Sequence, residues 1–236
     1  YGDNTRCHPY VLMNYSHTID SMFTLAHEMG HAMHSYLANK TQPHPKTSYS
    51  VFVAEVASTL NEGLMFNYLM DKSTDDGERL YLLDRHLTGT MGTFYHQIMY
   101  ARFELTIHEH VEKGGALSKD FLNELWAELT KKYYGPEILM DDATPMKWSR
   151  IPHFYNAFYV FQYATSFAAS QMILRKFVAG EKGIISDYLK MLASGGSDYP
   201  IELLKICGVD MSKPEAVSET MAKFESSVDE VDRLTD

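Results

Sequence analysis

The sequence predicts an all-α protein, and three observations support this class. Over most of the 236 residues, apolar side chains recur at steps of three and four, the period of an amphipathic helix. No charged or proline-rich linker, internal repeat or low-complexity tract divides the chain. Only residues 9–15, with the sequence PYVLMNY, have the composition of a strand. We therefore expect a single multi-helix domain over residues 1–236, with at most a short N-terminal edge strand.

The first helix is expected to begin near Thr18. Asp20 lies in its first turn, and apolar residues from Met22 to Leu37 follow at helical steps. Residues 39–50 contain two prolines among polar neighbours and show no periodicity, so they are expected to form a loop. A second helix is expected at 51–71. The two helices would then form an antiparallel hairpin.

Turn residues separate the remaining helices. A long helix at 78–112 contains Gly89 and Gly92, near which it could break. Ser118 is a suitable N-cap for the next helix, which the sequence YGPE ends. The helices that remain are expected at 119–134, 154–178, 182–193, 199–206 and 214–232.

The charge of the chain limits its partners. Asp and Glu number 31 and Lys and Arg 21, which gives a formal net charge of −10. Nucleic acids and anionic membranes are bound through basic surfaces, so neither is an expected partner. Residues 154–174 carry no charge, but polar side chains interrupt them. A helix buried in a soluble protein therefore fits this segment better than a membrane span.

The cysteine content and the first residues bear on the origin of the chain. Cys7 and Cys207 are the only cysteines, which is typical of the reducing cytoplasm rather than of a secreted disulfide framework. No signal peptide is visible in residues 1–20, and the chain begins with Tyr rather than Met. We therefore expect a fragment of a longer cytoplasmic protein.

The sequence HEMGH, residues 27–31, has the spacing of a zinc-hydrolase motif. On a helix, His27 and His31 lie on one face a turn apart, so both imidazoles can reach one Zn²⁺ ion. Glu28 lies about 100° further round the helix and can reach a water on the metal rather than the metal itself. In this motif the two histidines bind the metal, and the glutamate acts as the general base. Gly30 leaves room for another backbone or for substrate.

The motif alone does not fix the third ligand. A metzincin would have Gly and His three and six residues after His31, where this chain has His34 and Leu37. Cys207 is conceivable but lies in a distant segment without a supporting pattern. Glu55 is favoured, because it lies among apolar residues, where a carboxylate is costly to bury without a compensating cation. His34 is interpreted as a packing or surface residue.

Two further residues could support this ligand set. Two histidines and a glutamate leave one position of a tetrahedral zinc ion open, which is typical of catalytic sites. Ser58 and Glu62 follow Glu55 by three and seven residues, on the same helical face. We expect both to accept hydrogen bonds from the ligand imidazoles and to fix their orientation. The alternative is that Glu62 is a solvated helix residue.

Candidates for stabilising a transition state lie in the sequence HFYNAFYVFQY. Tyr155, Tyr159 and Tyr163 recur every four residues, so on the expected helix they would line one stripe, with His153 at its start. Buried phenol hydroxyls need hydrogen-bond partners, which favours a polar cavity. Donors in such a cavity could stabilise the oxyanion that forms when an amide is attacked. The alternative is that these tyrosines belong to the core.

Taken together, these motifs resemble those of a known family. HEMGH, the spacing of Glu55, Ser58 and Glu62, and HFYNAFYVFQYATS near the C-terminus are similar to the catalytic, C-terminal part of oligoendopeptidase F. Those enzymes are zinc metallopeptidases of the thimet-oligopeptidase-like group. The resemblance covers essentially all 236 residues. It implies a zincin-like catalytic domain with one Zn²⁺ per chain and oligopeptide substrates.

The resemblance also assigns roles by position. The metal ligands and the base fall in the first two helices, and the groups that contact substrate fall near the C-terminus. In that order they are His27, His31 and Glu55 with Glu28 as base, then His153 and Tyr163 as catalytic residues. Apart from the resemblance, we expect Tyr155 and Tyr159 to bind substrate. The spacing between His153 and Tyr163 is shorter than that between the corresponding residues of the thimet branch. Both Tyr159 and Tyr163 are therefore candidates for the tyrosine that contacts the scissile carbonyl.

The resemblance further implies a partner within the same protein. An N-terminal helical region, which this chain lacks, would roof a channel and admit only short peptides. Residues 9–15 resemble the edge strand along which such enzymes align an extended peptide. We expect a zinc metallo-endopeptidase that cleaves internal bonds of oligopeptides through a zinc-activated water. The alternatives are a peptide-binding protein with a vestigial or structural zinc site, and a related zinc carboxypeptidase or aminopeptidase.

Overall fold

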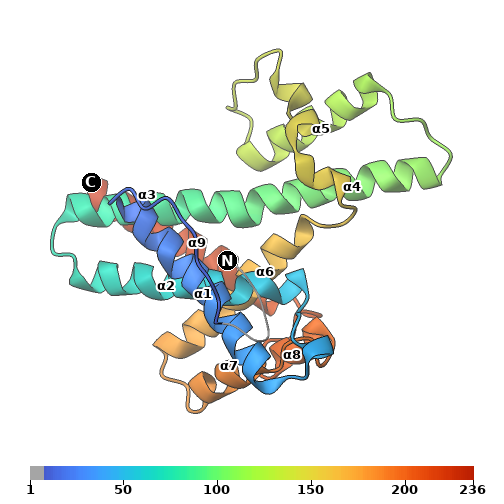
Figure 1. Ribbon diagram of the computed structural model, residues 1–236. Coiled ribbons are helices and arrows are strands. Elements are labelled where there is room, and N and C mark those ends of the chain that lie inside the picture. Colours follow the sequence, from blue (N-terminus) through green and yellow to red (C-terminus); the bar gives the residue numbers. More distant parts are fainter. Residues whose placement is uncertain (1–7) are drawn as a thin grey trace. The chain divides into compact units, whose positions relative to one another are not determined.

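The computed structural model describes residues 8–236 and confirms the all-α class. Figure 1 shows helices throughout, and no strand ladder forms within the described range. The helices fall into two compact units, and each is described by itself. Unit 1 comprises residues 8–89 and 165–236, and unit 2 comprises residues 90–164.

The helical elements follow the order that the sequence predicts. The elements of unit 1 are α1 (Ile19–Thr41), the short 3₁₀ helix η1 (His44–Lys46), α2 (Val51–Lys72), α3 (Asp76–Thr90), most of α6 (Phe161–Val178), α7 (Ile184–Ala193), α8 (Pro200–Lys205) and α9 (Glu215–Thr235). Those of unit 2 are the π-helical segment η2 (Met91–Tyr95), α4 (His96–Glu112), α5 (Lys119–Tyr134) and the 3₁₀ helices η3 (Thr144–Arg150) and η4 (Pro152–Tyr155).

Hydroxyl side chains cap the first turns of three helices. These caps satisfy backbone N–H groups that have no partner inside the helix. Thr18 accepts from the Ser21 N–H at 3.2 Å in α1, Ser50 from Phe52 at 3.2 Å in α2, and Ser118 from Phe121 at 3.1 Å in α5.

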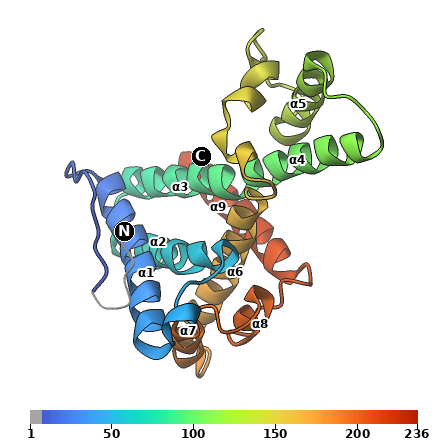
Figure 2. The same ribbon diagram turned by 45° about the vertical axis from the view of Figure 1, so that its right-hand side comes forward.

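Helices α1 and α2 pack against each other, and α2 runs back across α1 at an angle, so the predicted hairpin forms (Figures 1 and 2). The Asn61 side-chain amide donates to the Ala26 carbonyl at 3.1 Å. Further along, the backbones meet at Gly30, where an added Cβ would lie 2.5 Å from the Ala57 carbonyl oxygen. The space that the sequence reserves at Gly30 is therefore filled by the backbone of α2.

Unit 1 is built around α2, which is packed on more than one side. Its Thr59 hydroxyl donates to the Ser170 hydroxyl of α6 at 2.8 Å, and both groups are buried. An apolar cluster near the end of α2 joins it to α1 and α3. The buried members of this cluster are Phe23, Phe66, Leu82 and Leu83. The result is that residues along α2 are held in fixed positions relative to α1 and α6.

Unit 2 has a core of its own between α4 and α5. Its buried members are Met99, Phe103, Trp126 and Leu129, and the Trp148 ring packs against them. The Trp148 indole N–H donates to the Asn123 side-chain oxygen at 2.9 Å, so the polar edge of this ring is satisfied.

The helix predicted at 154–178 starts later than expected, at Phe161. Residues 152–155 form the 3₁₀ helix η4, and Phe158 has a φ of 55°, in the left-handed region that a helix excludes. The buried Glu104 carboxylate accepts the Phe158 N–H at 2.8 Å and holds this conformation. The prediction that Tyr155, Tyr159 and Tyr163 line one helical stripe is therefore wrong, because only Tyr163 is in α6.

Two other local predictions are also corrected. Residues 9–15 do not form a strand: Tyr10 makes a single bridge, and the Leu12 side chain is 95% exposed. A strand needs a sheet to pair with, and the described residues offer none. Near Gly89 and Gly92 the long helix is not interrupted but widens into the π-helical segment η2.

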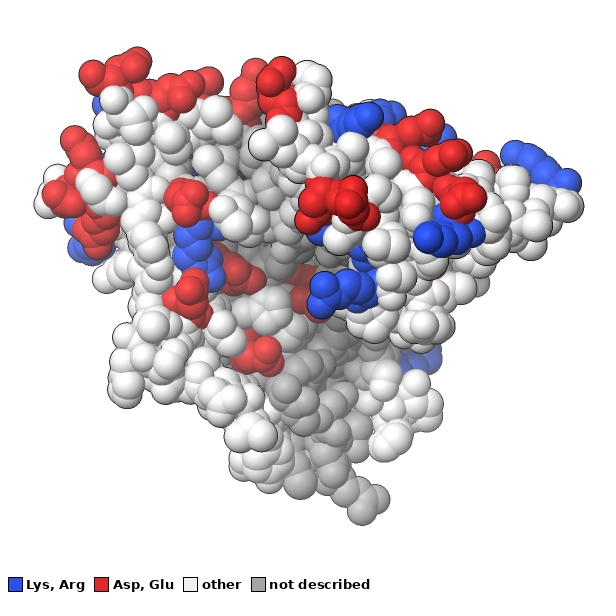
Figure 3. All heavy atoms as spheres, turned by 90° about the horizontal axis from the view of Figure 1, so that it is seen from above, with Lys and Arg blue, Asp and Glu red and all other residues white. Residues whose placement is uncertain are grey.

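Helix hydropathy and surface charge can be described for the same residues. Within residues 8–236, every helix is too short or too polar to cross a lipid bilayer. On the face drawn in Figure 3, Lys and Arg side chains alternate with Asp and Glu, and the described residues there form no continuous basic patch.

Candidate metal centre

Three side chains of α1 and α2 bring their ligand atoms together in unit 1. His27 and His31 are one turn apart on α1, and their Nε2 atoms lie 3.2 Å from each other. The Oε2 atom of Glu55, from α2, lies 3.4 Å from each of these nitrogens. The three atoms therefore form an almost equilateral triangle.

The dimensions of this triangle fit a zinc ion. Ligand atoms at about 2.0–2.1 Å from tetrahedral zinc are separated from one another by about 3.3 Å. The observed separations of 3.2 and 3.4 Å match this value. Two imidazoles and a carboxylate are also ligand types that zinc accepts. His27, His31 and Glu55 are thus a group that could hold one such ion.

Glu62 holds the His27 ring from the side away from this triangle. The His27 Nδ1–H donates to Glu62 Oε1 at 2.7 Å. With its proton on Nδ1, the ring leaves the Nε2 lone pair free for a cation. Glu62 therefore contacts a ring of the candidate ligand set and is only partly exposed to solvent.

Ser58 supports a different ligand from the one expected. Its hydroxyl donates to Glu55 Oε2 at 2.8 Å and does not accept from an imidazole. The physical reason is the spacing, since residues three apart on one helix are neighbours. Ser58 therefore fixes the orientation of the Glu55 carboxylate.

Electrostatic interactions shift the pKa values of two members of the group. Burial lowers the pKa of His27, but the hydrogen bond to Glu62 and the carboxylates of Glu62, Glu55 and Glu28 outweigh it, so the pKa lies above its usual value. Burial raises the pKa of Glu55, but the interactions with His31, Ser58 and His27 lower it further than that. The Glu55 carboxylate is therefore held in its charged, metal-binding form.

Glu28 and His34 lie near this group, and their surroundings differ. Glu28 is half-buried on α1, close enough to His27 for its charge to raise that pKa. His34 is fully buried and stacks on Tyr49, with ring centroids 3.6 Å apart. Burial, together with the charge of His31, lowers the pKa of His34 to about 3. His34 is thus a neutral packing residue, as the sequence indicates.

The aromatic candidates lie in unit 2, where three of them form a cluster. The His153 ring is 5.9 Å from each of the Tyr159 and Tyr163 rings, centroid to centroid, and those two rings are 5.5 Å apart. The two phenol oxygens are 3.4 Å apart. Tyr155 is 91% exposed and does not share these ring contacts among the described residues. The structure thus brings together three of the four predicted residues.

Asn61 is a structural residue of the site that sequence reasoning missed. Its hydrogen bond to Ala26 ties α2 to the turn of α1 just before His27. The available signal was its position, three residues after Ser58 and next to Glu62 on a largely apolar helix. Cys207, the other ligand considered, is buried, and burial raises the pKa of its thiol to about 12.

The Glu62–His27 pair leads to a prediction about metal affinity. Replacing Glu62 with Gln keeps an acceptor for the imidazole but removes the negative charge, so zinc affinity should fall about 10- to 100-fold. Competition with a chromophoric chelator measures this. Glu225→Gln, an exposed glutamate of α9, is the matched control and should bind zinc as the unmodified chain does. Equal affinity for Glu62→Gln would contradict the role of Glu62.

The helix pair and its His₂Glu group define a class: a helical protein with a candidate metal centre of the kind found in zinc peptidases. Comparison with known proteins specifies the family. Residues 3–223 match Peptidase family M3, and the chain belongs to this family.

Several bacterial proteins are similar to the chain. Oligopeptidase PepF of Bacillus subtilis is 42% identical over 234 residues, which are 99% of this chain and 34% of that protein. An oligoendopeptidase F homolog of Borreliella burgdorferi is 40% identical over 227 residues, 96% of this chain and 38% of that protein. The crystal structure of oligoendopeptidase-F from Enterococcus faecium superimposes with a TM-score of 0.83 and 39% identity, covering 92% of this chain and 39% of that one. The chain therefore spans less than two fifths of the length of these relatives.

Proposed function

We propose that the chain is the catalytic part of a zinc metallo-endopeptidase that hydrolyses internal bonds of short oligopeptides. The observation that carries this proposal is the triangle of ligand atoms from His27, His31 and Glu55, with sides of 3.2–3.4 Å. Family membership and relatives named oligopeptidase or oligoendopeptidase support the same activity. Zinc bound there would lower the pKa of a water molecule and polarise the scissile carbonyl.

The residues of the chain would then have different roles in the hydrolysis. Glu28 takes a proton from the attacking water and later delivers it to the leaving amine. His153 and Tyr163 donate hydrogen bonds to the oxyanion, and Tyr155 and Tyr159 contact the substrate. The contacts among the rings of His153, Tyr159 and Tyr163 support a shared role for this cluster.

The proposal extends to the organisation of the whole protein. Residues 1–236 would act as one catalytic domain, and the additional chain of the longer relatives would roof it and restrict access to short peptides. The relatives are long enough to supply such a region, since the chain covers only 34–39% of the length of three proteins similar to it. The low cysteine content supports a cytoplasmic location.

One experiment tests the function against both alternatives. The chain is loaded with zinc, its metal content is measured, and it is incubated with a quenched peptide that is acetylated at one end and amidated at the other. We expect one bound zinc per chain and cleavage at an internal bond, read by mass spectrometry. Metal binding without cleavage would favour the peptide-binding alternative. Cleavage only of peptides with free ends would favour a carboxypeptidase or aminopeptidase.

The assignment of Tyr163 has its own prediction. Tyr163→Phe removes only the phenol hydroxyl, and kcat should fall about 10²- to 10³-fold with zinc content unchanged, because one oxyanion donor is lost. Tyr199→Phe, at an exposed tyrosine of unit 1, is the control and should leave kcat unaltered. A loss of kcat in Tyr159→Phe but not in Tyr163→Phe would transfer the role to Tyr159.

A further inference from the structure

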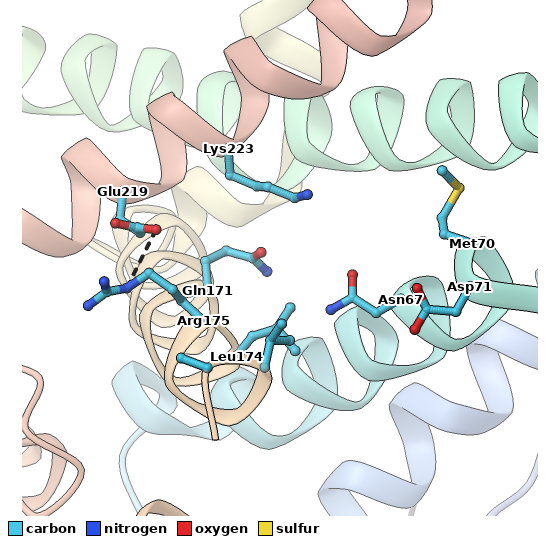
Figure 4. Close-up of a pocket in the computed structure, with 10 residues that line it drawn as sticks. Asn67, Met70, Asp71, Gln171, Leu174, Arg175, Glu219 and Lys223 are labelled. Atoms are coloured by element: carbon cyan, nitrogen blue, oxygen red, sulfur yellow. Dashed lines mark ion pairs between the residues drawn. The ribbon is translucent and has the colours of Figure 1, made fainter. Parts of the chain in front are cut away.

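A second cavity lies in unit 1 between α2, α6 and α9. Its volume is about 450 Å³, within the range of small-molecule sites. One wall is apolar and includes Leu174 and Val178 of α6 and Met70 of α2. Figure 4 shows the polar side chains that face this space from the three helices. No residue proposed for catalysis or metal binding lines it.

Two side-chain amides point into this cavity without protein partners. Gln171 is only 7% exposed, yet its amide forms no hydrogen bond with any described residue. The half-buried Asn67 amide likewise has no partner among residues 8–236. In Figure 4 both amides are directed at the same space, Gln171 from α6 and Asn67 from α2. Both amides face the open space of the cavity, so a polar ligand or water between them could supply the hydrogen bonds that they do not make with the described residues.

Two opposite charges in the cavity are also unpaired within the described part of the chain. Lys223 of α9 contacts no carboxylate; its Nζ lies 6.0 Å from the centroid of the Phe66 ring, and its side chain extends over the cavity in Figure 4. Asp71 of α2 contacts no cationic group. The neighbouring Arg175 and Glu219 differ, because they form an ion pair at 3.5 Å. Lys223 and Asp71 therefore give the cavity one positive and one negative charge that form no ion pair within residues 8–236.

We propose that this cavity binds a zwitterionic dipeptide. The carboxylate of the ligand would pair with Lys223 and its ammonium group with Asp71. Its single peptide bond has one N–H and one carbonyl, which the amides of Gln171 and Asn67 can satisfy. An apolar side chain of the ligand would lie against Leu174. Free amino acids lack the peptide bond, and blocked peptides lack one of the charges.

The cavity is distinct from the candidate metal centre. Asn67 follows Glu55 by 12 residues on α2, which is about 18 Å along the helix. The dipeptide site does not depend on the proposed peptidase activity, so its test requires no turnover.

The experiment titrates the full chain with the dipeptide Ala-Leu, with zinc removed by a chelator, and follows binding by NMR chemical shifts. We expect saturable binding, with shifts at residues of α2, α6 and α9. N-acetyl-Ala-Leu and Ala-Leu amide each lack one charge and should bind at least fivefold more weakly. Equal binding of all three peptides, or no shift at millimolar Ala-Leu, would overturn the proposal.

Matched variants locate the site. Lys223→Met, at an exposed position, should weaken Ala-Leu binding at least fivefold and abolish the difference between the acid and the amide. Gln171→Met, which keeps the side-chain size, should weaken all three peptides. Lys182→Met, at an exposed lysine outside the cavity, and His27→Ala in the metal centre should bind Ala-Leu as the unmodified chain does. If His27→Ala loses binding while Lys223→Met keeps it, the peptide occupies the metal centre and the proposal fails.

Discussion

Glu28→Gln is expected to lower kcat for peptide cleavage about 10²- to 10⁴-fold while the chain keeps its zinc. Glutamine has nearly the same shape as glutamate but cannot take up a proton from water. The metal ligands are untouched, because the group that could hold the ion consists of His27, His31 and Glu55 and does not include Glu28. Metal analysis and a quenched-peptide assay on the same preparation measure the two properties together.

The control for this experiment must remove a negative charge elsewhere. Glu225→Gln changes the net charge of unit 1 by the same amount and lies on the exposed surface of α9. It should cleave peptide at the unmodified rate. Near-normal cleavage by Glu28→Gln would show that another group acts as the base.

Gly30→Ala is expected to lower the free energy of unfolding by about 3 kcal/mol, near the upper end for overpacking. The added Cβ would lie 2.5 Å from the carbonyl oxygen of Ala57 and 2.6 Å from Cα of Ser58. These are backbone atoms, so no side chain can rotate out of the way and the two helices must move apart. Zinc affinity should fall as well, since the ligands come from both helices.

A second glycine provides the matched control for Gly30→Ala. Gly89 is in α3, and nothing lies within 4 Å of a Cβ added there. Gly89→Ala should stabilise unit 1 by up to about 1 kcal/mol, because alanine favours the helix. Denaturant unfolding of both variants gives the comparison. Equal stability of the two variants would mean that the close approach at Gly30 is not required.

Much of the metal centre could be predicted because its geometry is local. The spacing of His27 and His31 places them on one helical face wherever the helix lies in the fold. Glu55 was recognisable because a carboxylate among apolar residues requires a cation or a donor. The cap at Ser118 could be predicted from side-chain chemistry within a few residues.

The features that escaped prediction depend on contacts between distant parts of the chain. Nothing in residues 154–160 reveals that the backbone turns at Phe158, because the stabilising carboxylate, Glu104, is 54 residues away. The cavity that the Gln171 amide faces could not be predicted either, since three helices that are distant in the sequence form it. Periodicity alone therefore placed the start of α6 too early and gave no indication of the second cavity.

The candidate metal ligands and the side chains that orient them all lie between residues 27 and 62. Only one short loop has to close to bring them together, so the entropic cost of assembling the centre is small. A cation held there binds the paired α1 and α2 but not the separated helices. By mass action, a bound metal ion therefore stabilises the α1–α2 hairpin reversibly, and this stabilisation increases with the concentration of free metal.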